Sequence, residues 1–158
     1  MAPDTVLGID PGTANCGFAV LRGGAAPCLV KAGVIRPPVG RLGAALGEIY
    51  EGLAEVLAEH PTAEIAAERP LVNQRNPTQT IANSAVLGAV YLVAYQRGRP
   101  VTEYMPRVVK AAVAGTGAAS KAQVKAAVSE LLACQPLRPS HAADAAAVAI
   151  CHLLKTGR

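Results

Sequence analysis

Three short apolar runs open the chain, and a few turn-forming residues separate each from the next. The runs are Thr5–Asp10, Cys16–Arg22 and Cys28–Ile35, and all are rich in β-branched and apolar side chains. The links PGTAN and GGAAP contain glycine, proline or asparagine. Because links this short join only antiparallel neighbours, the pattern predicts a three-stranded meander.

Apolar residues next recur at the spacing of a helix, with glutamates on the opposite side. They follow the breaker RPPVG and are Leu42, Ala45, Leu46, Ile49, Leu53, Val56 and Leu57. The run Glu64–Glu68, EIAAE, predicts a buried strand that ends on a carboxylate. Asn76 and Pro77 are placed to cap and open a second helix, which we expect to continue to about Arg97.

The remaining pattern predicts a fifth strand and three further helices. The strand covers 100–105, and the helices cover 106–114, 120–134 and 140–155, with Ser140 as the expected cap of the last. Strand–helix–strand steps give parallel neighbours, so the first strand should lie beside the fourth. We therefore predict an α/β fold with a five-stranded mixed sheet flanked by helices, in a single domain of residues 1–158.

Acidic residues stand where several predicted elements begin or end. Asp10 ends the first strand and Glu68 ends the fourth, which places them about one strand spacing, roughly 5 Å, apart. His141 and Asp144 project from one face at the start of the last helix. Neighbouring carboxylates repel unless a cation, a proton or an arginine lies between them. Carboxylates with an imidazole favour Mg²⁺ or Mn²⁺.

Each of these residues also has a structural interpretation. Asp10 precedes Pro-Gly and suits a turn, while Asp144 is an acid favoured by the dipole at a helix start. A histidine at a helix start, such as His141, is usually a polar surface group. Taken singly, these interpretations are at least as good as a functional one. Together, the coincidences at one sheet edge favour a metal site, whereas His60 and His152 are interpreted as structural.

Basic residues are expected near the same edge. Arg69 and Arg75 lie in the loop directly after Glu68. Lys121 opens a helix after GTGAAS, where a phosphate would meet backbone N–H groups and an ammonium together. Each of them also suits a solvated surface, and for Lys125 that interpretation is preferred. The other basic residues expected on this side are Arg107 and Lys110.

The composition mainly excludes classes of protein. Of 158 residues, 51% are hydrophobic and 16% charged, which argues against disorder. Lys and Arg outnumber Asp and Glu by 15 to 11, a net charge of +4 that is compatible with a polyanionic partner without requiring one. The 4 cysteines form no CxxC pair, so we expect free thiols in a reducing cytosol. Without an apolar run of 18 residues, we expect a cytoplasmic protein with no membrane partner.

Four segments together resemble the RuvC Holliday junction resolvases of bacteria. They are LGIDPGTANCGFAV, AAERPLV, GTGAASKAQV and HAADAAAVAICH, in that order from about Val6 to His152. The resemblance implies an RNase H-like fold, a homodimer and a four-way DNA junction as substrate in homologous recombination and DNA repair. It implies paired symmetric nicks that leave 5′-phosphate and 3′-hydroxyl ends, and cooperation with the RuvA–RuvB branch-migration complex.

The resemblance also assigns roles to residues. The family's acidic metal-binding residues correspond by position to Asp10, Glu68 and Asp144, and its functional lysines near the scissile phosphate to Lys110 and Lys121. His141 stands where the family often has a fourth aspartate, as metal ligand or general base. Leu71 stands where an aromatic often wedges into the junction, which implies a smaller apolar wedge.

A mechanism consistent with these residues uses two divalent cations, Mg²⁺ or Mn²⁺, about 3.5–4 Å apart and bridged by Asp10. Glu68 would hold one cation, and Asp144 with His141 the other. Lys121 would stabilise the negative charge of the phosphate. The expected catalytic set is Asp10, Glu68, His141, Asp144 and Lys121, and the expected DNA contacts are Arg69, Leu71, Arg75, Arg107, Lys110 and Lys121.

Alternatives remain open at this point. Residues 78–97 are apolar around most of the predicted helix, which suits either deep burial or packing on a second copy. A kinase or ATPase of the actin and sugar-kinase type begins with a similar strand, but it needs a second phosphate loop and an adenosine pocket. A catalytically silent junction-binding module is the other rival, and the intact acidic set argues against it.

Overall fold

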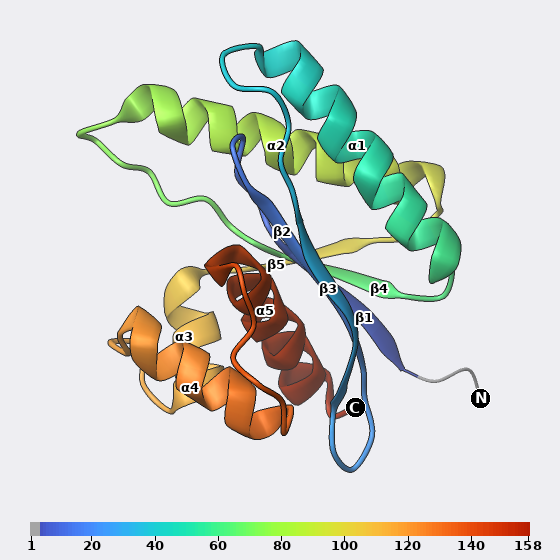
Figure 1. The fold of residues 1–158 in the computed structure, drawn as a ribbon, viewed down its shortest axis with the longest axis vertical. Helices are drawn as coiled ribbons and strands as arrows, with labels where there is room; N and C mark the ends of the chain where they lie inside the picture. The colour runs from blue at the N-terminus through green and yellow to red at the C-terminus, as the bar shows by residue number, and fades with distance from the viewer. Residues whose placement is uncertain (1–3) are drawn as a thin grey trace.

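The computed structural model describes residues 4–158, which form one five-stranded sheet with helices on both faces (Figure 1). The strands are β1 (Thr5–Asp10), β2 (Cys16–Arg22), β3 (Cys28–Ile35), β4 (Glu64–Glu68) and β5 (Val101–Tyr104). The helices are α1 (Leu42–Glu59), α2 (Pro77–Gln96), α3 (Pro106–Ala114), α4 (Lys121–Leu131) and α5 (Ser140–Thr156). None of the helices among residues 4–158 is long and apolar enough to cross a lipid bilayer.

The strand order is β3-β2-β1-β4-β5, with β1 in the centre of the sheet. The pairs β1–β2 and β2–β3 are antiparallel, and the pairs β1–β4 and β4–β5 are parallel. The predicted meander, and the predicted position of the first strand beside the fourth, are confirmed. The short links after β1 and β2 enforce the antiparallel half, and the long α1 and α2 connections allow the parallel half.

The sequence predicted most element boundaries, and the exceptions have local causes. The fourth helix was expected to reach residue 134 but ends at Leu131, because the chain turns there and Ala133 takes a left-handed conformation with φ 46°. The expected cap by Ser140 is wrong. Pro139 occupies the cap position without a side-chain hydrogen bond, and Ser140 is already helical. Asn76 does cap α2, since its Oδ1 accepts a hydrogen bond from the Gln79 N–H at 3.1 Å.

The sheet separates two apolar cores. One core lies between the sheet and α3, α4 and α5, and the other between the sheet and α1 and α2 (Figure 1). Alternate residues of β1 face the two cores, Val6 toward α5 and Leu7 and Ile9 toward α1 and α2. By the same period of two, Asp10 points to the α5 side. Ala66 of β4 also faces α5, so Glu68 is directed to that side as well.

Helix α5 lies unusually close to the sheet, because the facing residues have small side chains or none. A Cβ atom built on Gly8 would come within 2.2 Å of the Ala145 carbonyl oxygen. One built on Gly17 would come within 2.1 Å of the His141 carbonyl oxygen. Gly17 pairs with Asp10 across β1 and β2, so the first turn of α5 is held directly over the end of β1. The small alanine side chains of α5 permit this close contact, which explains why the helix is rich in alanine.

We expect Gly8→Ala to lower the free energy of unfolding by about 1–3 kcal/mol, because the added Cβ would displace the backbone of α5. Gly47→Ala in α1 is the matched control. A Cβ there meets nothing within 4 Å, so this change should raise stability by about 1 kcal/mol through helix propensity. Urea unfolding of both variants measures the difference. Equal midpoints for the two variants would contradict close packing of α5.

Candidate active site

A pocket of about 520 Å³ opens at the carboxyl ends of β1 and β4. Its lining brings together the four residues of the predicted acidic site, which are Asp10, Glu68, His141 and Asp144. Two come from the sheet and two from the first turns of α5, as predicted from their spacing. The close packing of α5 on Gly17 explains why groups more than 130 residues apart in sequence meet here.

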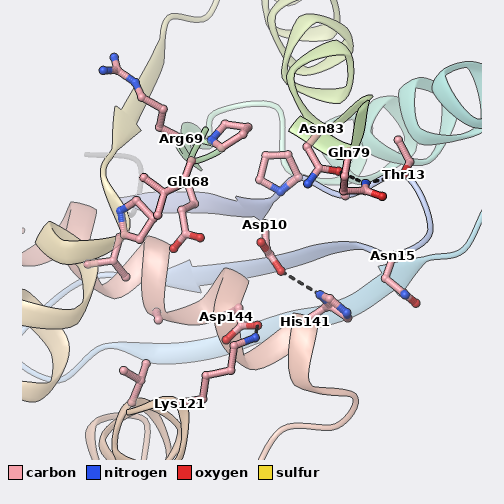
Figure 2. Close-up of a pocket in the computed structure, with 18 of the residues that line it drawn as sticks. Asp10, Thr13, Asn15, Glu68, Arg69, Gln79, Asn83, Lys121, His141 and Asp144 are labelled. Carbon is pink, nitrogen blue, oxygen red and sulfur yellow. Dashed lines mark hydrogen bonds and ion pairs between the residues drawn. The ribbon is translucent and has the colours of Figure 1, made fainter. Parts of the chain in front are cut away.

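The tightest part of the site joins β1 to α5. The Nδ1 atom of His141 lies 3.0 Å from Oδ2 of Asp10. One ligand atom each from Asp10, His141 and Asp144 can be chosen so that all three lie within 4.8 Å of one another. Glu68 follows Ala67, which pairs with Ile9, so Glu68 lies beside Asp10 but outside that group. Figure 2 shows Asp10 between Glu68 and His141, with Asp144 below them.

The electrostatics of the pocket are dominated by buried negative charge. Burial, reinforced by the charges of Asp10 and Asp144, raises the pKa of Glu68 to about 7. Burial also raises the pKa of Asp10, although its hydrogen bond with His141 acts in the opposite direction. The nearest balancing cation is Lys121, whose Nζ lies 3.9 Å from Oδ2 of Asp144. The carboxylates therefore hold more negative charge than the side chains around them neutralise.

This donor set fits a divalent cation. Carboxylate oxygens with one imidazole nitrogen suit Mg²⁺ or Mn²⁺, and the nitrogen is better tolerated by Mn²⁺. Asp10, His141 and Asp144 are partly buried and already gathered, so little rearrangement is needed for them to bind an ion. A bound cation would also relieve the repulsion that raises the pKa of Glu68.

The structure places some of the predicted DNA-contacting residues in the pocket and others outside it. Four of them line the pocket, namely Arg69, Leu71, Lys110 and Lys121. Arg75 and Arg107 are exposed and lie outside the lining. Arg69 is held in place, since its Nε donates to Oε2 of Glu103 at 2.8 Å, and Glu103 also accepts a hydrogen bond from Tyr91. His152 lies away from the pocket and bonds to Glu64 and Tyr104.

Sequence reasoning missed one wall of the pocket. Figure 2 shows its residues across Asp10 from Lys121. They come from the link after β1 and the first turns of α2, and they are Thr13, Asn15, Gln79 and Asn83. The only sequence signal was a pair of amides four residues apart in an otherwise apolar helix. Their place in the site depends on how α2 lies over the β1–β2 link, which no local pattern reveals.

The strand order, the helices on both faces and the carboxylates at the ends of β1 and β4 define a nuclease of RNase H-like fold. The family described as Crossover junction endodeoxyribonuclease RuvC matches residues 6–152. The chain therefore belongs to the RuvC family, whose members resolve Holliday junctions.

Individual relatives agree with this assignment. The chain is 40% identical to the RuvC of Halorhodospira halophila, over 93% of this chain and 88% of the relative. It is 41% identical to that of Syntrophomonas wolfei, over 94% and 87%. The structure of Thermus thermophilus RuvC in complex with Holliday junction substrate superposes with a TM-score of 0.90 at 32% identity, covering 97% of this chain and 94% of that one. The yeast mitochondrial resolvase Ydc2, at 16% identity and a TM-score of 0.68, shares the fold and covers 96% and 78%.

We expect Glu68→Gln to stabilise the metal-free protein in a pH-dependent way. The pKa of Glu68 is raised in the native state to about 7, so its contribution to stability is present below about pH 4.5 and is lost as the pH rises through about 7. At pH 8 in EDTA the variant should therefore unfold with a free energy about 2–3 kcal/mol above wild type, and at pH 4 the gain should vanish.

Denaturant titrations at the two pH values measure this difference. Glu48→Gln, which removes a glutamate from the exposed side of α1, controls for the change in net charge. An equal gain from Glu68→Gln at both pH values would contradict the crowding of carboxylates in the pocket.

Proposed function

We propose that residues 1–158 act as a single nuclease domain that cuts four-way DNA junctions by paired symmetric nicks. The main supporting observation is that four side chains able to bind metal meet in one pocket, in a chain that belongs to the RuvC family. The Holliday junction bound to the Thermus thermophilus relative supports the same substrate class. Water adds to the phosphorus and the bond to the 3′-oxygen breaks, which leaves a 5′-phosphate and a 3′-hydroxyl.

We assign the ligands from their positions. Asp10 would bridge two divalent cations, with Glu68 on one side and His141 and Asp144 on the other. Bound there, Mg²⁺ or Mn²⁺ ions would supply Lewis-acid charge to the attacking water and the leaving oxygen. The bridging role suits Asp10 because it lies beside Glu68 at the strand ends and also belongs to the close group with His141 and Asp144.

The other side chains orient and stabilise the reacting groups. The hydrogen bond between Nδ1 of His141 and Oδ2 of Asp10 fixes the orientation of the imidazole ring. It leaves Nε2 available as a metal ligand or a general base. The Lys121 side chain is 77% exposed and only loosely paired with Asp144, so its ammonium is free to turn toward a phosphate. Lys110 enters the same pocket from α3 and would share that task.

The loop after β4 supplies a candidate wedge. Leu71 and Val72 are both exposed, and Leu71 also lines the pocket. Two aliphatic side chains at the edge of a DNA site would insert between unpaired bases at the crossover. Arg69 and Arg75 from the same loop, and Arg107 from α3, would contact backbone phosphates.

The exposed side of α2 supports the proposal of a homodimer. This helix buries one side against the core but leaves a second apolar stripe uncovered, with Ile81 69%, Leu92 52% and Tyr95 81% exposed. Gly88 lies on the same stripe and has open space around it. A second copy packed here would relate two active sites by a two-fold axis, as two symmetric nicks require. We further propose that the protein cooperates with the RuvA–RuvB branch-migration complex and that it acts in the cytoplasm.

The first test is cleavage of a mobile four-way junction, end-labelled on each strand, in Mg²⁺ and in Mn²⁺. Wild type should give paired nicks at symmetric positions. Asp10→Asn should reduce cleavage on the order of a hundredfold or more while junction binding persists. Asp4→Asn, which changes an aspartate outside the pocket, should cut like wild type. Nicking by Asp10→Asn at the wild-type rate would remove Asp10 from the mechanism, and no nicks by wild type in either metal would overturn the function.

Sedimentation tests the dimer. Wild type should sediment as a dimer at micromolar concentration, and Leu92→Glu should weaken the dimer on the order of a hundredfold or more, because two charges would be buried at the two-fold axis. Val39→Glu changes an apolar residue away from α2 that is more exposed than Leu92, and it should leave the dimer intact. A wild-type monomer, or a dimer unaffected by Leu92→Glu, would exclude this interface.

A further inference from the structure

The pocket has two chemically different walls. Lys110 and Lys121 enter from α3 and α4, while the wall formed by the β1–β2 link and α2 carries no charge. Three side chains of that second wall are joined by hydrogen bonds, and we call them the amide wall. They are Thr13, Gln79 and Asn83.

The amide wall has a fixed hydrogen-bonding pattern. The Nε2 atom of Gln79 donates to Oδ1 of Asn83 at 2.9 Å and to Oγ1 of Thr13 at 3.3 Å. Three hydrogen-bonding groups of these side chains remain, which are the acceptor Oε1 of Gln79, the donor Nδ2 of Asn83 and the hydroxyl hydrogen of Thr13. Within residues 4–158, none of these three has a protein partner. One acceptor and one donor are therefore left unused, one on each of the two amides that this hydrogen bond joins.

The fold does not need these amides where they are. The cap of α2 is already supplied by Asn76, and Gln79 and Asn83 follow one turn apart on the pocket side of an apolar helix. Asparagine inside a helix is less favourable than alanine by roughly 0.5 kcal/mol. Asn83 thus costs helix stability, and together with Gln79 it presents an organised donor and acceptor to the pocket, which is typical of ligand recognition.

The chemistry of the ligand follows from the lack of charge. A phosphate is held best by cations, and those lie on the other side of the pocket. An uncharged acceptor and an uncharged donor are instead the groups that contact the edges of nucleobases, as the amides of asparagine and glutamine do with adenine. Because one continuous pocket connects the amide wall to Asp10, a nucleotide with its phosphate at the carboxylates has its base within reach of α2.

We infer that Gln79 and Asn83, oriented by Thr13, contact the edge of the base next to the scissile phosphate and set the sequence at which the junction is cut. This inference rests on the proposed function and adds the selection of the cleavage site. The amide wall acts on the relative rates at different sequences, whereas the carboxylates act on the rate at every sequence.

The test uses four mobile junctions that differ only in the base beside the expected cut, and each enzyme is described by its ratio of best to worst cleavage rate. Wild type should show a ratio of about tenfold or more. Gln79→Met keeps the length of the side chain without its polar atoms, and Asn83→Ala removes the second amide. Both should reduce the ratio to about twofold or less, the loss expected when one base contact is removed.

The ratio is a readout that folding, metal content or enzyme concentration does not move, since all four rates come from one preparation. Gln135→Met removes an amide from the exposed link between α4 and α5, outside the pocket, and should keep the wild-type ratio. The inference is overturned if wild type cuts all four junctions equally, or if both Gln79→Met and Asn83→Ala keep its ratio. Failure of wild type to nick any junction would overturn the proposed function with it.

Discussion

The close approach of α5 to the central strands is the constraint on which the site depends. Two glycines, Gly8 and Gly17, remove the side chains that would hold the helix away from the sheet. Only at that distance does the imidazole of His141 reach the carboxylate of Asp10, with Asp144 one turn further along. The sheet fixes one half of the cluster through strand register, and backbone packing fixes the other half. The metal-binding side chains are therefore positioned by strands and a helix and not by flexible loops.

That packing concentrates acids in a poorly solvated place, and the surroundings do not neutralise them. Desolvation is the first cause of the raised pKa values of Asp10 and Glu68, and mutual repulsion adds to it. An ion pair with a well-packed arginine would have relieved the repulsion permanently. The structure instead keeps Lys121 exposed and 3.9 Å from Asp144, which leaves the acids available to an exchangeable cation.

The sequence predicted what local periodicity and strand order determine. The strand ends and the parallel pairing of β1 with β4 placed Asp10 and Glu68 at one sheet edge, and the helical spacing placed His141 and Asp144 on one face. Prediction failed at two helix ends because of the local backbone: Ala133 takes a left-handed conformation just after α4, and Pro139 occupies the cap position before Ser140. The amide wall was missed for a different reason, since Gln79 gains its place only by lying against Thr13, which is distant in sequence.

Helix α2 joins two of these features in one rigid body. Its 20 residues span about 30 Å, with Gln79 near one end and the uncovered stripe running to Tyr95 near the other. If two copies meet along that stripe, the length of the rigid helix α2 sets the separation of the two active sites. The dimer would then hold its two active sites at a fixed separation. A junction arm displaced from one active site would also be out of register at the other.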